Sequence, residues 1–266
     1  MATSSPGTVL ITGASSGIGE ALAARFAQAG HDLVLVARSA DKLQVLARAL
    51  KAGHGVKTWV APADLSLPGA AEQLAAAMRR SRRRIDILVN NAGVLSHGPF
   101  VEMDAARHQQ LIDLNVSGLT AMVAAFVPAM VQRGAGRVLN VASIAAFQPV
   151  PLLATYAATK AYVLSLTESL SEELKGTGVT ITALCPGITA TNMLAGAQQE
   201  SEQLGRLPQF VVGSAAAVAD EGFDACMKDE VICVPGVLNL AGTLAARATP
   251  KWLLRKVSGA VIRRLR

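Results

Sequence analysis

Short apolar runs alternate with amphipathic stretches along most of the chain. Apolar runs of strand length lie at Val9–Thr12, Leu33–Ala37, Thr58–Ala61, Ile85–Asn90, Arg137–Val141 and Val179–Leu184. Apolar positions at helical spacing lie between them, at Ile18–Ala29, Asp41–Leu50, Gly69–Met78, Ala105–Val131 and Thr155–Lys175. Apolar strands separated by helices are typical of a parallel sheet covered on both faces. The pattern therefore predicts an α/β fold with a doubly wound parallel sheet of about seven strands.

Nothing in the sequence marks a division of the 266 residues into two domains. The chain contains no repeat and no linker rich in proline, serine or glycine. A content of 51% hydrophobic and 17% charged residues excludes a largely disordered chain, because disordered segments are poor in apolar residues. We therefore expect a single domain over residues 1–246, followed by a short tail over residues 247–266.

Cysteine usage and the N-terminal sequence bear on the cellular compartment. The cysteines, Cys185, Cys226 and Cys233, show no metal-ligand spacing, so neither a disulfide scaffold nor a metal site is expected. No positively charged region precedes an apolar core at the N-terminus, so no secretory signal is expected. Polar residues and Pro128 interrupt the charge-free run Leu114–Gln132, which suits a buried helix better than a bilayer span. These features predict a cytoplasmic protein.

The net charge of +6 is concentrated at the C-terminal end. From Arg247 onward the chain has seven basic residues and no acidic ones, and the rest carries 18 basic against 19 acidic residues. A nearly neutral body argues against a nucleic-acid partner. A basic amphipathic helix that starts at Pro250, with Trp252 near its start, would suit weak peripheral contact with an anionic membrane. The alternative is that this tail covers the body or a partner subunit.

The segment between the first predicted strand and the first predicted helix is rich in glycine. It reads Thr12-Gly13-Ala14-Ser15-Ser16-Gly17-Ile18-Gly19. Gly13 suits a tight turn, Gly17 a close approach of the backbone to a pyrophosphate, and Gly19 the close packing of helix on strand. The first N–H groups of the helix would then face the phosphates. This arrangement favours a dinucleotide site over an ordinary turn.

The spacing Gly-x-x-x-Gly-x-Gly and several later motifs resemble the short-chain dehydrogenase/reductase family. In chain order these motifs are Asp64-Leu65, Asn90-Asn91-Ala92-Gly93, Asn115, Ser143, Tyr156-Ala157-Ala158-Thr159-Lys160 and Pro186-Gly187-Ile188-Thr189-Ala190-Thr191. The resemblance covers residues 8 to about 235 and extends loosely to the hydroxysteroid-dehydrogenase-like and ketoacyl-reductase-like branch. It implies a Rossmann-type fold and an NAD(P)-dependent oxidoreductase that acts on CH–OH and C=O groups.

The predicted catalytic residues are Asn115, Ser143, Tyr156 and Lys160. Tyr156 and Lys160 would share one helix face, and an ammonium there would lower the pKa of the phenol from about 10. Ser143 follows an apolar strand and would bind a substrate carbonyl while Tyr156 delivers the proton, so both are predicted substrate contacts. The resemblance implies that Lys160 also holds the nicotinamide ribose and that Asn115 holds a water. The alternative for Ser143 is a cap on the next segment. For Asn115, hydrogen bonding to buried backbone groups is a second role that is compatible with the first.

The predicted cofactor site draws on the same motifs. Its residues are Gly13, Ser15, Ser16, Gly17, Ile18, Gly19, Arg38, Ser39, Asp64, Leu65, Asn91, Ala92, Gly93, Tyr156, Lys160, Pro186, Gly187, Ile188 and Thr191. Dinucleotide folds usually carry an acidic residue after the second strand for the ribose 2′-OH. Here Ala37 occupies the position of that acidic residue, and Arg38 follows it. The guanidinium group of an arginine is suited to bind a 2′-phosphate. We therefore expect NADP(H) rather than NAD(H). Asp64 would accept a hydrogen bond from the adenine amino group, and the alternative role is that of a helix N-cap.

The segment after Pro186-Gly187 bears on the substrate. In the family it forms a lid, here expected over residues 188 to about 213. The apolar residues of this segment favour an apolar carbonyl or alcohol substrate. The alternative is that they pack on the body or on a second subunit. They are Met193, Leu194, Leu204, Leu207 and Phe210. A non-catalytic NADP(H)-binding regulator and a nucleotide-sugar epimerase or dehydratase are the alternatives. The regulator is disfavoured because it would not need all four catalytic residues. The epimerase or dehydratase is disfavoured because the chain is too short for a separate sugar-binding domain after the sheet.

The two longest predicted helices, Ala105–Val131 and Thr155–Lys175, are apolar beyond one face. The resemblance implies that they pair across a two-fold axis in a homodimer or homotetramer. The side chains expected at that interface are Leu119, Met122, Ala125, Phe126, Tyr162, Leu166 and Leu170. Ordinary burial within one subunit is the alternative.

Overall fold

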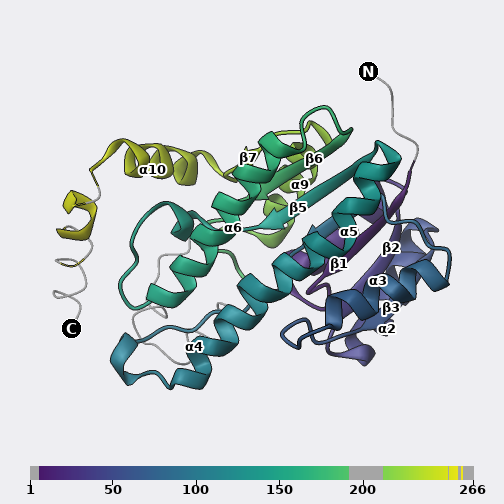
Figure 1. Cartoon of the computed structure of the whole chain (residues 1–266), viewed down its shortest axis with the longest axis horizontal. Coiled ribbons are helices and arrows are strands. Elements are labelled where there is room, and N and C mark those ends of the chain that lie inside the picture. The colour runs from purple at the N-terminus through teal and green to yellow at the C-terminus, as the bar shows by residue number, and fades with distance from the viewer. Residues whose placement is uncertain (1–5, 192–211, 251, 257–258, 260–266) are drawn as a thin grey trace.

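A seven-stranded parallel sheet forms the centre of the protein (Figure 1). The computed structural model describes residues 6–191, 212–250, 252–256 and 259. The strands follow the spatial order β3-β2-β1-β4-β5-β6-β7, and every pair of neighbours is parallel. Their bounds are β1 Thr8–Thr12, β2 Asp32–Ala37, β3 Thr58–Pro62, β4 Ile87–Asn90, β5 Gly136–Val141, β6 Val179–Leu184 and β7 Ile232–Cys233. This order confirms the predicted doubly wound α/β fold.

Helices cover both faces of the sheet and give each face its own core. They are α1 Gly17–Gln28, α2 Ala40–His54, α3 Ala70–Arg80, α4 Ala105–Ile112, α5 Leu119–Arg133, α6 Ala154–Glu173, α9 Ala215–Met227 and α10 Val237–Ala248. Successive strand residues point to opposite faces. Leu10 of β1 accordingly packs in the core that includes α3, α5 and α6, whereas Val9 and Ile11 pack in the core that includes α1, α2 and α9. Burial on both sides thus explains the apolar runs of the inner strands, whereas the edge strand β3 is only partly buried.

The predicted helix Ala105–Val131 is interrupted in the structure. A π-helical turn, Asp113–Gly118, separates α4 from α5. A Cβ at Gly118 would lie 2.3 Å from the Leu65 carbonyl oxygen, so the wider turn lies directly against the chain after β3. Turns of this kind often occur at functional sites. Helices α9 and α10 were not predicted from the sequence pattern.

The apolar side of α5 faces the sheet. Leu119, Met122 and Phe126 are at most 6% exposed and belong to the core of the subunit, so the expectation that they face a second subunit is wrong. Among the described residues, the stretch Ala105–Arg133, which comprises α4, the π-helical turn and α5, is long and apolar enough by composition to cross a membrane. Its α5 part is buried against the sheet, which fits the buried helix predicted for Leu114–Gln132.

Only the ends of the predicted lid fall among the described residues. Thr189 and Gly213 pair in an isolated parallel bridge, which holds the two ends together. The apolar residues expected in the lid lie outside the described residues: Met193, Leu194, Leu204, Leu207 and Phe210.

Candidate functional site

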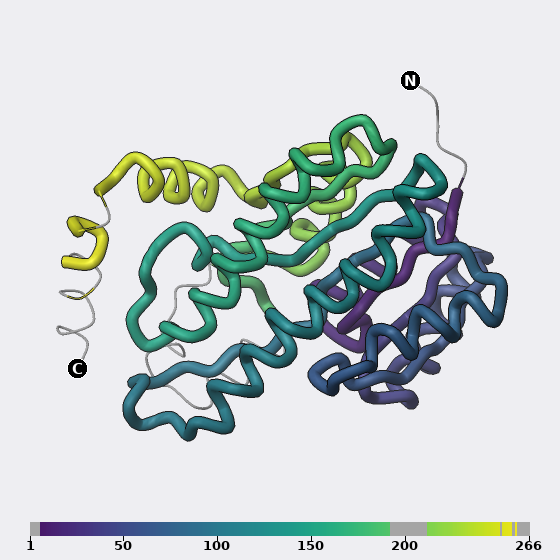
Figure 2. The backbone as a smooth tube through the Cα atoms, in the orientation of Figure 1, coloured from purple at the N-terminus to yellow at the C-terminus, as the bar shows by residue number. Residues whose placement is uncertain are grey.

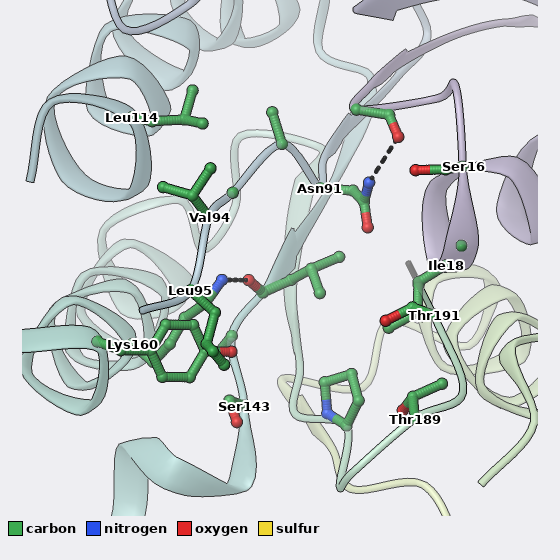
Figure 3. Close-up of a pocket in the computed structure, with 18 of the residues that line it drawn as sticks. Ser16, Ile18, Asn91, Val94, Leu95, Leu114, Ser143, Lys160, Thr189 and Thr191 are labelled. Atoms are coloured by element: carbon green, nitrogen blue, oxygen red, sulfur yellow. Dashed lines mark hydrogen bonds between the residues drawn. The ribbon is translucent and has the colours of Figure 1, made fainter. Parts of the chain in front are cut away.

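A cavity of about 630 Å³ opens at the carboxyl ends of the strands. Doubly wound sheets bind their ligands at this edge. All the predicted catalytic and cofactor-binding residues line it except Gly19 and Asn115. Figure 3 shows Lys160, Leu95 and Val94 on one side of the cavity and Ser16, Ile18 and Thr191 on the other.

The glycine-rich turn joins β1 to α1 at the edge of the cavity. Gly13 and Gly17 have φ angles of 65° and 60°, in the left-handed region that glycine adopts readily. A Cβ at Gly19 would lie 2.3 Å from the Gly13 carbonyl oxygen, so Gly19 allows the turn and the helix to pack closely. Ser16 precedes α1, and its side chain forms no capping hydrogen bond to the helix. The turn therefore presents the N-terminus of α1 to the cavity, where an anion is favoured.

Thr12 and Asn91 tie the end of β1 to the end of β4. The Thr12 hydroxyl oxygen accepts hydrogen bonds from the backbone N–H groups of Asn91 and Ala92, each at 3.0 Å. The Asn91 side-chain amide donates to the backbone oxygens of Thr12 at 3.0 Å and Gly13 at 3.2 Å. The role of Thr12 was missed, although its place before the first glycine of the turn was visible in the sequence.

A second part of the cavity lies where β2 leads into α2. Arg38 and Ser39 line it as predicted, and Lys42, on the first turn of α2, lines it as well. Lys42 was missed; its place in the first turn of the helix that directly follows Arg38 and Ser39 was the available signal. Two cations and a hydroxyl in one part of the cavity favour a dianionic group.

Asp64 follows β3 and lines the same cavity. Its Oδ1 accepts hydrogen bonds from the Ser66 hydroxyl at 2.6 Å and the Ser66 backbone N–H at 3.0 Å. The Ser66 hydrogen bonds lower the pKa of Asp64, and the charge of Arg38 acts in the same direction. Gly69, not Asp64, precedes α3, so Asp64 is not the N-cap of that helix. It remains a carboxylate that faces the cavity.

Lys160 is buried in the wall of the cavity. Its Nζ donates a 2.8 Å hydrogen bond to the Val141 carbonyl oxygen at the end of β5 (Figure 3). Burial lowers the pKa of this lysine to about 8. At neutral pH the side chain is therefore still mostly an ammonium, held at the end of the strand that leads to Ser143.

The pKa of Tyr156 shifts in the direction opposite to the predicted one. Burial raises the pKa of the phenol, and hydrogen bonding by Ser143 only partly opposes this shift. The expected lowering by Lys160 is wrong, because the loss of hydration dominates and the ammonium is bonded to a backbone carbonyl instead. Tyr156 is therefore a neutral phenol at neutral pH.

Ser143 combines the two roles that its sequence position suggested. Its Oγ accepts a 3.1 Å hydrogen bond from the Ala145 N–H, which caps the short 3₁₀ helix Ile144–Phe147. Its side chain also lines the cavity and stabilises the phenolate form of Tyr156 by hydrogen bonding. The cap orients the hydroxyl beside the phenol.

Asn115 lies behind the cavity wall, in the π-helical turn. Its side chain accepts a 2.9 Å hydrogen bond from the Val94 N–H and donates one of 2.9 Å to the Val94 carbonyl. It also donates to the Thr159 hydroxyl at 3.2 Å. Asn115 thus satisfies buried backbone groups, as its polar position within an apolar run predicted, and positions the segment that leads from Gly93 into the cavity wall.

Apolar side chains form much of the wall near Ser143 and Tyr156. They come from loops after β4 and β5 and were missed: Leu95, Ile144, Val150 and Leu153. Gln148 is a polar group among them. The available signal was the apolar character of both loops, which directly follow strands at the ligand-binding edge.

The described part of the chain contains no cluster of three or more His, Cys, Asp or Glu side chains that could hold a metal ion. The cysteines are buried, and burial raises the pKa of each thiol to about 12.

Comparison with known proteins leads to the same family. Residues 7–202 match the short chain dehydrogenase family. Sulfoacetaldehyde reductase 2 from Chromohalobacter salexigens is 38% identical over 185 residues, which are 69% of this chain and 73% of that protein.

Two solved structures extend the likeness over nearly the whole chain. A short-chain dehydrogenase from Sphingobium yanoikuyae in complex with NADPH has a TM-score of 0.80 and 36% identity, covering 92% of this chain and 96% of the other. The bulky-bulky ketone specific alcohol dehydrogenase from Comamonas testosteroni has a TM-score of 0.77 and 32% identity, covering 94% and 96%. The chain therefore belongs to the short-chain dehydrogenase/reductase family and is an NAD(P)-dependent oxidoreductase.

Proposed function

We propose that this enzyme transfers hydride between NADP(H) and the carbonyl or secondary alcohol of an apolar substrate, with Tyr156 as the general acid and base. One observation carries the proposal. The cavity that Ser143, Tyr156 and Lys160 line is the same cavity that Arg38 and Lys42 line. The residues proposed to transfer the proton and those proposed to bind a 2′-phosphate therefore line one cavity.

The residues present fit a dinucleotide. Left-handed glycines let the backbone approach the pyrophosphate, and a Cβ at Gly17 would come within 3.0 Å of the Thr191 side chain. The N-terminus of α1 would hold the phosphates, and Lys160 the nicotinamide ribose. When bound, the nicotinamide supplies or accepts the hydride.

The preference for NADP(H) rests on the turn after β2. Ala37 occupies the position where an acidic residue would bind the ribose 2′-OH. Arg38, Ser39 and Lys42 line the cavity there and would donate charge-assisted hydrogen bonds to a 2′-phosphate. Similar solved structures include complexes with NADPH and with NAD, so this chain's own residues carry the argument.

The protein's part in the reaction is to orient the carbonyl and supply one proton. The Ser143 hydroxyl donates to the carbonyl oxygen while hydride adds to the carbonyl carbon. Tyr156, whose raised pKa keeps it protonated, gives its proton to the developing alkoxide and later regains one from solvent. In oxidation the same atoms move in reverse, and Tyr156 must first lose its proton.

The substrate is an apolar ketone or secondary alcohol. Leu95, Val150 and Leu153 surround the catalytic end of the cavity and favour apolar groups on the carbonyl carbon. The Comamonas testosteroni relative, named as specific for bulky-bulky ketones, points to the same class.

A panel of apolar ketones and alcohols tests the proposal. Nicotinamide absorbance would be followed with NADPH and NADH in parallel, with Tyr156→Phe as the control for each active substrate. We expect turnover with at least one apolar ketone, faster with NADPH. Tight NADPH binding without turnover on any carbonyl would instead support a non-catalytic regulator.

We also propose that the enzyme works as a homodimer or homotetramer in the cytoplasm. Leu119, Met122 and Phe126 are buried inside the subunit. The outward side of α5 and α6 therefore includes residues that are smaller or more polar than these three. Ala124 is exposed, and the exposed Tyr162 bonds to the Thr120 hydroxyl at 2.9 Å across the two helices. A two-fold contact here would cover Ala124 and the Thr120–Tyr162 pair.

A further inference from the structure

Helix α10 presents an apolar face to solvent. It contacts the body through Asn239, Thr243 and Ala246, which fall on one side of the helix, the last two being buried. The opposite side is apolar throughout: Val237, Leu238, Ala241, Leu244, Ala245 and Ala248. Val237 is 82% exposed, Leu238 77% and Leu244 56%. Figure 2 shows α10, in yellow, along one edge of the molecule.

The exposed apolar surface continues beyond α10. Pro250 precedes a second helical segment, where its carbonyl accepts a 2.9 Å hydrogen bond from the Leu253 N–H. Trp252 is 54% exposed and Leu253 is 38% exposed in this segment. Single exposed apolar residues are common, but neighbouring ones on successive helices usually mark an interaction site.

The charge of the same part of the chain indicates the partner. From Arg247 to the C-terminus there are seven basic residues and no acidic ones, whereas the rest of the chain is nearly neutral. Arg247 faces the body, 4.0 Å from Glu168 and 5.7 Å from the Phe147 ring. Lys256 lies 5.4 Å from the Trp252 ring, beside the exposed apolar residues.

We propose that α10 and the segment after Pro250 dock on an anionic lipid surface. The apolar face of α10 and Trp252 would enter the boundary between headgroups and acyl chains, and the basic residues would contact the lipid phosphates. A second copy of the chain fits less well, because a two-fold contact through α10 and Trp252 would bring Arg255 and Lys256 of the two copies close together. The docking itself does not depend on the proposed reaction; only its consequence for an apolar substrate rests on the proposed function.

Docking there would place the cavity beside the membrane. Asn239 of α10 lies against Gly187, where an added Cβ would come within 2.5 Å of the Asn239 amide, and Gly187 lines the cavity. Arg247 lies over Phe147, in the 3₁₀ helix whose Ile144 and Ala145 also line the cavity. An apolar substrate dissolved in the lipid would then lie close to the site that uses it.

Co-sedimentation of the full chain with vesicles tests the proposal. Vesicles of phosphatidylcholine alone would be compared with vesicles that contain phosphatidylglycerol, at low and high salt. We expect binding to the anionic vesicles that high salt weakens. The double variant Leu238→Glu, Leu244→Glu should bind at least about tenfold more weakly, since both side chains would leave the lipid.

The matched control is the double variant Val45→Glu, Val101→Glu, which adds the same two charges at exposed positions far from α10 in the sequence. Val45 is 59% exposed on α2, and Val101 is 90% exposed in the segment Phe100–Glu102. This control should bind like the wild type. Equal weakening by both changes, or no binding of the wild type at low salt, would overturn the proposal. Unchanged thermal unfolding of the double variant would verify that it folds.

Trp252 gives a second readout. The chain has two tryptophans, so Trp59→Phe leaves Trp252 as the only one. Its emission should move to shorter wavelength with anionic vesicles and be quenched by brominated lipid. Emission that stays unchanged would overturn lipid docking. Light scattering that shows a smaller oligomer for the Leu238→Glu, Leu244→Glu variant, without vesicle binding by the wild type, would identify a second copy as the occupant.

Discussion

The Lys160 ammonium lies 5.8 Å from the centre of the Tyr156 ring, yet its hydrogen bond goes to the backbone of β5. Burial raises the pKa of the tyrosine and lowers that of the lysine to about 8, so it favours the neutral form of each. Tyr156 is therefore ready to give a proton at neutral pH. Reduction should proceed there without prior ionisation, whereas oxidation should become faster as the pH rises.

Tyr156→Phe tests the role of the phenol. The change removes the hydroxyl and keeps the ring, so turnover should fall by about 10²–10⁴-fold while the dissociation constant for NADPH changes little. Tyr162→Phe is the control, since Tyr162 lies on the same helix and bonds to Thr120 rather than facing the cavity. Steady-state kinetics and a fluorescence titration decide it; a Tyr156→Phe enzyme with near-normal turnover would exclude this mechanism.

Arg38→Asp tests the choice of cofactor. Loss of a charge-assisted contact with a 2′-phosphate costs about 1.5–3 kcal/mol, so NADPH should bind about 10- to 100-fold more weakly while NADH binds at least as well. The same change at Arg48, which lies further along α2 and does not line the cavity, should leave both affinities unchanged. Equal affinity of the wild type for the two cofactors would contradict the assignment.

The sheet and the cofactor turn were predictable because short-range features of the sequence encode them. Each strand is a short apolar run, since helices cover both faces of the sheet. The glycines of the turn mark positions where a side chain has no room, as the 2.3 Å approach of a Cβ at Gly19 to Gly13 shows. Both signals lie within a few residues of the structure that they specify.

The π-helical turn and the pKa shifts depend on contacts that are distant in the sequence. Hydrogen bonds with Val94 hold the Asn115 side chain inward, and Gly118 packs on Leu65. The helical periodicity of the sequence reveals neither contact. Spacing places Tyr156 and Lys160 on one helix face but says nothing of the loops that bury them. Helical periodicity likewise does not distinguish an interface from a core, which explains the error at Met122.

Ala124→Arg tests the proposed assembly. Ala124 is exposed on α5, so a long cation there should disturb a close two-fold contact without entering the core of the subunit. Multi-angle light scattering should show a smaller particle than the wild type at the same micromolar concentration. Ala52→Arg, at an exposed position on α2, should leave the mass unchanged. A wild type that is already monomeric would reject the oligomer, and an unchanged Ala124→Arg mass would move the interface elsewhere.

Lys160→Met should reveal the cost of the buried ammonium as a function of pH. The pKa of Lys160 is about 8 in the folded protein, whereas the ordinary pKa of an exposed lysine is 10.5. Between these values the unfolded chain binds more protons, so the lysine's contribution to the free energy of unfolding rises with pH. From pH 7 to pH 9 the free energy of unfolding of the wild type should rise by about 1 kcal/mol relative to that of Lys160→Met.

Two other effects do not enter this change with pH. The raised thiol pKa values are present in both proteins, and the hydrogen bond to Val141 is missing from the variant at both pH values. Urea unfolding at both pH values measures it, with Lys51→Met on the exposed side of α2 as the control. A difference that does not change with pH would mean that Lys160 keeps an ordinary pKa in the folded enzyme.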